Sequence, residues 1–215
     1  MLVTGIFPDD LKQSRVTPIF KDGDKSECEN YKPISVISAI SKVLETLISD
    51  QLALHLNDNN IIVKQQSGFR KCHSTETALL HKTDQYLLNM DKSILNGVLF
   101  LDLKKAFDTF HINDLPNCLE ETQASMFADD TSISSSGTSL LEIENKINND
   151  LHNVNIWLET NKLTLNTEKT EFMLIASKRK LKQYSGNPNI TIGSHDIKQV
   201  INKKVLGIIL DEELK

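Results

Sequence analysis

Two adjacent aspartates, Asp129 and Asp130, interrupt the apolar and β-prone stretch SMFADDTSI at residues 125–133. A third aspartate, Asp102, directly follows the apolar run VLFL. Burying one unpaired carboxylate is costly, and burying two like charges together costs more. The pair is therefore expected either in a solvated turn or around a bound cation. The residue types alone leave both alternatives open.

The three aspartates could bind divalent cations if their local structures bring them together. Segment 97–103 (GVLFLDL) predicts a buried central strand, and MFADDTSIS predicts a tight hairpin with the aspartates in its turn. Two divalent ions about 4 Å apart can clamp the attacking and leaving oxygens of a phosphoryl transfer. Mg²⁺ suits such a cluster because it prefers hard oxygen ligands and binds substrate phosphates, and Mn²⁺ is an alternative.

Hydrophobic periodicity predicts the helices that must position these carboxylates. Residues 35–57 carry apolar side chains at helical spacing, and a second helix is expected from Ser74 to about Met90. Four side chains of this second helix are expected to face inward: Leu79, Leu80, Tyr86 and Leu87.

The C-terminal half mixes one long helix with short strands. Ser139 and Glu142 form a capping-box pattern that predicts the start of a helix reaching about Glu159. Three later segments, EFMLIAS, NITIG and VLGIILD, are strand-like. The whole pattern indicates an α+β fold with an antiparallel sheet, preceded by a mostly helical region with a boundary near residue 95.

The composition is that of an ordinary soluble globular protein, with 215 residues, 39% hydrophobic and 25% charged. A net charge of −5 gives no general sign of a polyanion partner, so nucleic-acid binding would depend on local geometry. Three scattered cysteines argue against a disulfide framework or structural zinc and fit a reducing compartment. The start lacks a signal-peptide pattern, and no apolar run approaches the ~20 residues of a membrane span, so no membrane partner is expected.

The motifs around the aspartates match a known family. FADD at 127–130 and LFLDLKKAFDT at 99–109 resemble the catalytic motifs of reverse transcriptases from non-LTR retrotransposons, the LINE and jockey-like class. Further blocks resemble the family in the same order. They are GIFPDDLKQSRVTPIFKDGD, NYKPISVISAISKVLE, QQSGFRKCHSTETALL, WLETNKLTLNTEKTEFMLI and VLGIILD.

The resemblance implies an RNA-directed DNA polymerase domain built from fingers and palm. Residues 1–95 would form the fingers-like, mostly helical region. Residues 96–215 would form the palm-like region, with the catalytic strand, the FADD hairpin, the long helix and a primer-grip strand in VLGIILD. The implied reaction is the transfer of a deoxynucleotide from a dNTP to a primer 3′-hydroxyl on an RNA template, with two Mg²⁺ ions. The family context also implies an intracellular location, in the nucleus or cytoplasm.

The resemblance also implies roles for single residues. Asp102, Asp129 and Asp130 would be the metal ligands, and the Leu103 carbonyl would help to hold one ion. Phe107 would stack under the incoming sugar and exclude a 2′-hydroxyl. The residues that would contact the triphosphate, the nucleotide or the template are Lys21, Lys32, Gln66 and Arg70, and Lys169 would protonate or stabilise the departing pyrophosphate.

Simpler readings stand beside these roles. Without the resemblance, each basic residue is most simply a solvated surface charge and Phe107 a core aromatic. Lys32 also replaces the arginine that is usual in the family, so it keeps the charge but lacks the planar bidentate fork.

The spacing departs from the family in one place. Asp102 and Asp129 are only 27 positions apart, whereas the family has several dozen more residues there, including a block resembling G-x-P-Q-G-S. The chain is therefore expected to carry an internal deletion between Phe110 and Ile112, and to lack part of the palm and the thumb. The alternatives are an impaired polymerase domain and a catalytically dead remnant that at most binds RNA or a partner. A metal phosphohydrolase would explain the aspartates but not the ordered blocks.

Overall fold

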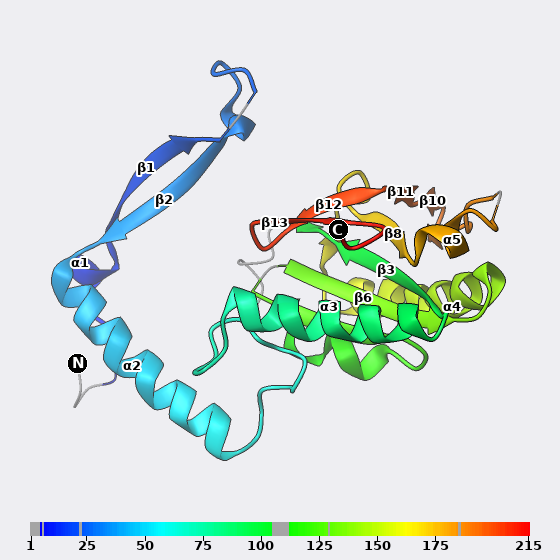
Figure 1. Cartoon of the computed structure of the whole chain (residues 1–215). Coiled ribbons are helices and arrows are strands. Elements are labelled where there is room, and N and C mark those ends of the chain that lie inside the picture. Colours follow the sequence, from blue (N-terminus) through cyan, green and yellow to red (C-terminus); the bar gives the residue numbers. More distant parts are fainter. Residues whose placement is uncertain (1–4, 6, 22, 105–111, 129, 185) are drawn as a thin grey trace. The chain divides into compact units, whose positions relative to one another are not determined.

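The computed structural model describes residues 5, 7–21, 23–104, 112–128, 130–184 and 186–215 (Figure 1). Internal contacts divide the chain into two compact units, Met1–Ile61 and Ile62–Lys215. The boundary expected near residue 95 is a different one, because it separates a fingers region from a palm region. That separation stays a prediction.

The first unit is a β-hairpin followed by a long helix. Strands β1 (Ser14–Phe20) and β2 (Tyr31–Ile37) pair antiparallel, and Ser38 caps helix α2 (Ala39–Asp58) by accepting from the Ser41 backbone N–H. The Ser41 hydroxyl donates to the Leu11 carbonyl at 2.9 Å, which ties α2 to the chain before β1. The helix predicted over 35–57 thus begins later, because the residues before the cap extend β2. The short helices of this unit are α1 (Asp9–Lys12) and η1 (Cys28–Asn30).

The second unit is built on a five-stranded sheet with the order β11-β8-β3-β6-β5. The central strand β3 is buried throughout and pairs antiparallel with both β6 and β8, while β11 runs parallel to β8. The strands of this sheet are β3 (Leu95–Leu101), β5 (Gln123–Phe127), β6 (Asp130–Gly137), β8 (Glu171–Ile175) and β11 (Lys198–Gln199).

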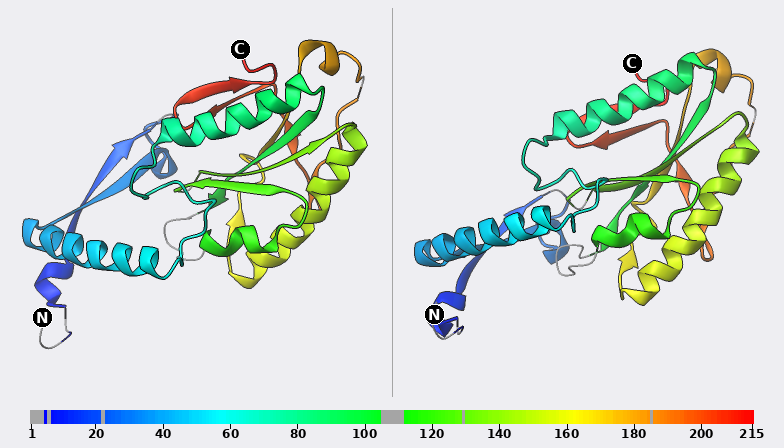
Figure 2. Two further views of the ribbon diagram at one scale, coloured as in Figure 1. Left: turned by 60° about the horizontal axis from the view of Figure 1, so that its bottom comes forward. Right: turned by 90° about the horizontal axis from the view of Figure 1, so that it is seen from below.

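Helices α3 (Thr75–Asp91) and α4 (Leu140–Thr160) cover opposite faces of this sheet (Figure 2). Alternate residues of β3 point to opposite faces, so each face gains its own core. Leu95, Leu99 and Leu101 pack with α4, whereas Val98 and Phe100 pack with α3. A central strand buried on both faces explains the continuous apolar run in the sequence.

The α3 side buries fewer of its helix residues than predicted. Leu79 and Tyr86 are buried as expected. Leu80 and Leu87 are 60% and 44% exposed, so the prediction that these two side chains face inward is wrong. These leucines lie beside the buried stripe, on a face that no described element of the second unit covers. Ser139 caps α4 as predicted, and Glu142 accepts from the backbone N–H of Thr138 rather than from that of Ser139.

The segment VLGIILD is a hairpin rather than one strand. β12 (Asn202–Val205) turns at Leu206 and Gly207, both with positive φ, into β13 (Ile208–Asp211). The glycine permits this two-residue turn. The remaining elements are β4 (Leu103–Lys104), η3 (Ile112–Cys118), β7 (Thr164–Leu165), α5 (Lys178–Leu181), β9 (Thr191–Ile192) and β10 (His195–Asp196).

The fold class is mixed α and β with mainly antiparallel sheets, as expected. Among the described residues, no helix has the length and apolar character needed to cross a membrane.

Candidate active site

Asp102 and Asp130 lie at the same end of two neighbouring strands. The last pair in the β3–β6 register is Leu101 with Thr131, so the next positions in each direction are Asp102 and Asp130. Positions that continue an antiparallel register lie opposite each other and on one face. Both aspartates line one small cavity of about 60 Å³. Asp102 is half-buried and Asp130 is exposed.

The backbone around Asp102 is anchored by the segment that precedes β8. The Asp102 N–H donates to the Thr170 hydroxyl at 3.3 Å, and the Asp102 carbonyl accepts from the Asn166 N–H at 2.7 Å. Thr170 is fully buried. Because this segment is held against the strand end, it brings Lys169 to the same cavity.

The FADD segment forms a tight hairpin as predicted, but the expectation that both aspartates lie in its turn is wrong, because Asp130 is the first residue of β6. Phe127 pairs with Asp130, so a two-residue turn joins β5 to β6. Ala128 adopts a φ of 56°, which is the left-handed conformation that two-residue hairpins favour. The second turn residue, Asp129, lies outside the described residues.

The QQSGFR loop lies directly against this hairpin. The Ser67 N–H donates to the Met126 carbonyl at 2.8 Å, and the Met126 N–H donates to the Gln65 carbonyl at 3.0 Å. A Cβ added at Gly68 would collide with the backbone nitrogen of Ala128. Glycine at this position therefore allows the two backbones to approach closely.

Gln66 and Arg70 are consequently held beside the hairpin. The Gln66 side-chain amide donates to the Gly68 carbonyl at 3.3 Å, and the Arg70 guanidinium donates to the Gln66 carbonyl at 3.4 Å. Both side chains are half-buried. Their described contacts stay within their own loop, which fixes the shape of the loop next to the FADD turn.

Lys82 is a site residue that the sequence analysis missed. It extends from α3 into the cavity that holds Asp102 and Asp130, and its ammonium donates to the Ser132 hydroxyl at 2.8 Å. Burial lowers the pKa of Lys82 to about 8, and the nearby Asp130 carboxylate opposes this shift. The available signal was its spacing: Lys82 follows Leu79 by three residues on the buried side of the helix.

Two further lysines, Lys203 and Lys204 of β12, line the same cavity. Lys203 forms an ion pair with Glu171 at 2.5 Å and donates to the Lys169 carbonyl at 3.4 Å. The cavity therefore combines carboxylates at the strand ends with ammonium groups from α3, β12 and the segment before β8. This combination of charges suits a phosphate-bearing ligand that binds together with divalent cations.

The remaining predicted site residues are Leu103, Phe107, Lys21 and Lys32. Leu103 is buried and pairs with Leu165, and Phe107 lies outside the described residues. Lys21 and Lys32 belong to the hairpin of the first unit, where both are exposed. The Lys21 N–H donates to the Asn30 carbonyl at 2.9 Å, and Lys32 pairs with Ile19.

The donor set agrees with a divalent cation. Asp102 and Asp130 present hard oxygen ligands to one cavity, which is the ligand type that Mg²⁺ and Mn²⁺ prefer. Within the described ranges, no group of three or more His, Cys, Asp or Glu side chains is close enough to hold a metal ion. The third carboxylate of the predicted trio is Asp129, outside these ranges.

Comparison with known proteins finds a family that is similar to part of this chain. Residues 19–123 match the family described as reverse transcriptase (RNA-dependent DNA polymerase), a range that ends where β5 begins. A probable RNA-directed DNA polymerase from transposon BS of Drosophila melanogaster is 36% identical over 105 residues, covering 47% of this chain and 11% of that protein.

Two further relatives are mobile-element polymerases. A probable RNA-directed DNA polymerase from transposon X-element of Drosophila melanogaster is 35% identical, over 49% of this chain and 12% of that protein. An RNA-directed DNA polymerase from mobile element jockey of Drosophila funebris is 30% identical, over 50% of this chain and 12% of that protein. The matched part of the chain resembles reverse transcriptases of non-LTR, jockey-like mobile elements, and the chain spans about a tenth of the length of these relatives.

Proposed function

We propose that this chain contributes the catalytic carboxylates of an RNA-directed DNA polymerase, transferring a deoxynucleotide from a dNTP to a primer 3′-hydroxyl on an RNA template. The observation that carries the proposal is the shared cavity of Asp102 and Asp130, next to the FADD turn and the QQSGFR loop. In this proposal residues 96–215 form the palm and residues 1–95 the fingers.

In the proposed site, Asp102 and Asp130 hold divalent cations together with Asp129 and the Leu103 carbonyl. When bound, these ions supply the positive charge that stabilises the attacking and leaving oxygens of the phosphoryl transfer. Lys169 lines the same cavity and would stabilise or protonate the departing pyrophosphate. Positioning and charge stabilisation would provide most of the rate, since phosphoryl transfer needs little covalent help from the protein.

The nucleotide would be held by the remaining predicted residues. Gln66 and Arg70 lie beside the FADD turn, which supports a role near the nucleotide or the template. Phe107 would select deoxyribose, Lys21 would contact the triphosphate, and Lys32 would contribute to nucleotide binding. The exposure of both lysines leaves their ammonium groups available for such contacts.

The short spacing between Asp102 and Asp129 leads us to propose that synthesis is impaired. Twenty-four residues, from Leu103 to Met126, connect the strand to the hairpin. By the resemblance, a G-x-P-Q-G-S-like block that aligns template and nucleotide is expected here, and this chain lacks it. Misplacing reacting groups by about 1 Å can cost ~10²-fold in rate. The alternative is a dead remnant that at most binds RNA or a partner.

Primer extension on an RNA template with Mg²⁺ or Mn²⁺ tests the function. The chain is expected to add single deoxynucleotides slowly, and Asp102→Asn should abolish this addition. Asp196→Asn, which changes an exposed aspartate in β10, is the matched control and should keep the activity.

A thermal-shift titration with the same metals separates an impaired enzyme from a remnant. Metal should raise the melting temperature of the parent chain and of Asp196→Asn, but not that of Asp102→Asn or Asp129→Asn. No metal response and no extension in the parent chain would reject the polymerase proposal.

A further inference from the structure

Lys82 projects from α3 toward the strand ends that carry the two described carboxylates of the candidate site. Its ammonium donates to the Ser132 hydroxyl at 2.8 Å, and Ser132 is buried in β6. Side chains two positions apart on a strand point to the same face, so Ser132 and Asp130 face the same way, with their Cα atoms roughly 7 Å apart. The bond to Ser132 therefore holds a positive charge close to the Asp130 carboxylate.

Asp102 lies on the same face of the sheet. Phe100 of β3 packs on the α3 side, and Asp102 follows it by two positions. Phe100 also pairs with Ser132 in the β3–β6 register. The side chains of Asp102, Asp130 and Lys82 all line the small cavity of about 60 Å³. Helix α3 thus places an ammonium group opposite both carboxylates.

This position is costly for Lys82 without a negative partner. Lys82 is half-buried, and taking an ammonium group out of water is unfavourable unless charge and hydrogen bonds replace the solvent. The Ser132 hydroxyl accepts one hydrogen bond but carries no charge. The Asp130 carboxylate supplies the charge, and its effect is visible in the pKa of Lys82, which Asp130 raises against the lowering caused by burial.

We propose that Lys82 is a positioning residue of the carboxylate site: its ammonium is the counter-ion of Asp130 while no metal is bound, and it competes with a divalent cation for that carboxylate. In the metal-free chain this positive charge offsets the repulsion between Asp102 and Asp130 and ties β6 to α3. The competition with metal rests on the proposed function, whereas the pairing with Asp130 does not.

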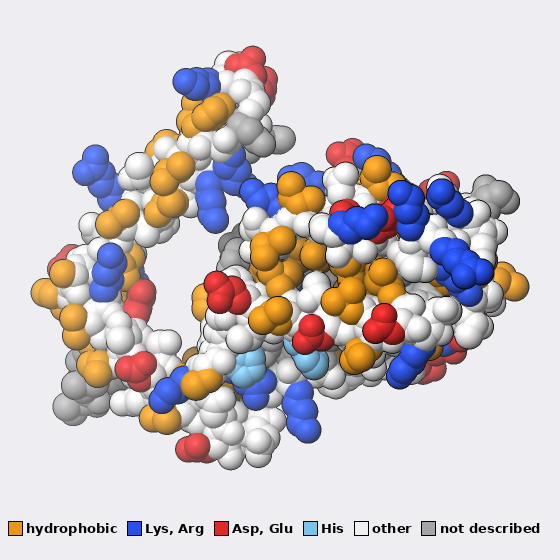
Figure 3. Space-filling view, in the orientation of Figure 1, with side chains coloured by type: hydrophobic (Ala, Val, Ile, Leu, Met, Phe, Trp, Pro, Cys, Tyr) orange, Lys and Arg blue, Asp and Glu red, His pale blue; other side chains and the backbone are white. Residues whose placement is uncertain are grey.

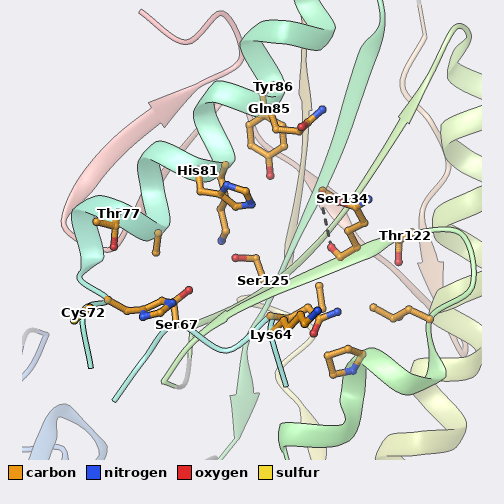
Figure 4. A pocket seen from close by; sticks show the side chains of 18 residues that line it. Lys64, Ser67, Cys72, Thr77, His81, Gln85, Tyr86, Thr122, Ser125 and Ser134 are labelled. Atoms are coloured by element: carbon orange, nitrogen blue, oxygen red, sulfur yellow. Dashed lines mark hydrogen bonds between the residues drawn. The ribbon is translucent and has the colours of Figure 1, made fainter. Parts of the chain in front are cut away.

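A larger cavity of about 720 Å³ gives the ammonium group room to withdraw when a metal binds. Lys82 lines this cavity as well as the small one. Figure 4 shows Thr77, His81 and Gln85 projecting from α3 on one side of it, with Ser125 of β5 across from them. The described side chains of its lining include no carboxylate, so an ammonium that withdraws here loses its counter-ion. Displacing Lys82 therefore costs free energy, and this cost lowers the metal affinity.

A double-mutant cycle in EDTA tests the pairing without metal or chemistry. Urea unfolding is measured for the parent chain, Lys82→Met, Asp130→Asn and the double variant. Asp130→Asn should raise the unfolding equilibrium constant by at least about threefold more when Lys82 is present, because only then does it leave an ammonium without its counter-ion. Lys82→Gln repeats the cycle with a side chain that can still donate to Ser132 but has no charge. It should lose the coupling as Lys82→Met does.

Lys82→Met combined with Asp196→Asn is the matched control, because Asp196 is an exposed aspartate of β10 outside both cavities. The effects of these two changes should add. Additive effects of Lys82→Met and Asp130→Asn, with each variant shown by circular dichroism to be folded, would overturn the pairing. Coupling that persists in the Lys82→Gln cycle would also overturn it, since the hydrogen bond and not the charge would then be responsible.

Mn²⁺ binding measured by electron paramagnetic resonance tests the competition. Lys82→Met and Lys82→Gln should bind Mn²⁺ about three- to tenfold more tightly than the parent chain, because a nearby positive charge is removed. Lys82→Arg keeps the charge and should stay near the parent affinity. Lys178→Met, which changes an exposed lysine of α5, should do the same. Unchanged or weaker binding by Lys82→Met would overturn the competition.

These measurements separate the role of Lys82 from the proposed polymerase function. Tighter Mn²⁺ binding by Lys82→Met, with no primer extension by any variant, would keep the role of Lys82 and reject the polymerase. Absence of Mn²⁺ binding in every variant would reject the metal site and with it the competition. The cycle in EDTA would still decide whether Lys82 pairs with Asp130.

Discussion

The two units of the chain differ in how their apolar side chains are used. In the first unit, the only described residue that is buried is Ser41, and apolar residues of α2 such as Ile40 and Val43 are more than 60% exposed. In the second unit, β3 is buried on both faces and α4 packs its apolar stripe against it. Figure 3 shows the orange side chains that remain on the surface of the hairpin and helix of the first unit.

This difference teaches that amphipathic spacing specifies a helix but not its burial. Helices α2 and α4 both repeat apolar residues at helical spacing, and both are capped by a serine. Within its own unit α4 covers a face of the five-stranded sheet and gains the free energy of burial, whereas the described residues of the first unit leave the apolar side chains of α2 largely exposed. We therefore expect the stability of the chain to reside in the second unit, with the first unit opening more readily.

The largest expected effect compares the same substitution in the two helices. Ile147→Ala in α4 removes a fully buried side chain and should lower the free energy of unfolding by about 2–5 kcal/mol. Ile48→Ala in α2 changes a side chain that is 56% exposed and should alter it by no more than about 0.5 kcal/mol. Urea denaturation followed by circular dichroism measures both. Similar losses would show that α2 is covered in solution and would remove the contrast.

A smaller effect is expected where β3 meets α4. A Cβ added at Gly97 would collide with Ile143 and come within 2.9 Å of Ile147. Gly97→Ala should therefore cost about 1–3 kcal/mol through overpacking. Gly186→Ala, where an added Cβ meets nothing within 4 Å, is the control for the glycine change itself. If both variants melt at the temperature of the parent chain, the packing between β3 and α4 is looser than described.

The smallest expected effect is on how the stability of the chain falls in acid. It is tested by comparing one carboxylate from each unit. Hydrogen bonds from Lys146 and from the Thr138 backbone lower the pKa of Glu142 to about 2, and Ser26 hydrogen bonds lower the pKa of Asp24. A carboxylate whose pKa is lower in the folded chain than in the unfolded chain stabilises the fold at pH values above its unfolded-state pKa. This stabilisation is lost as the pH falls through its folded-state pKa. The loss for Glu142 thus runs from about pH 4.5 down to about pH 2.

Because the Glu142 side chain is partly exposed, its contribution is screened by solvent and is expected to be at most about 1 kcal/mol. Glu142→Gln should lower stability at pH 7 and reduce the further loss in acid, as measured by thermal unfolding between pH 2 and 7. Asp24→Asn lies in the first unit and should leave the main unfolding transition unchanged. A larger effect from Asp24→Asn than from Glu142→Gln would reverse the assignment of stability to the second unit.

Much of the local structure could be predicted from the sequence. The periodicity and the Ser139 cap located α4, the apolar run located β3, and the turn composition of FADD located the β5–β6 hairpin. These features depend on residues close in the chain, where capping, turn geometry and side-chain spacing act directly. The types of the candidate ligands, Asp102 and Asp130, were also visible without any structure.

The tertiary structure alone decided which faces are covered and which side chains share a cavity. It left Leu80 and Leu87 exposed, turned VLGIILD into a hairpin, and brought Lys82 from α3 to the carboxylates at the ends of β3 and β6. Burial and electrostatic contact depend on segments far apart in the chain, so no local pattern specifies them. The sequence by itself determined the elements and the chemistry available, and only the packing of the sheet between α3 and α4 decided where that chemistry meets.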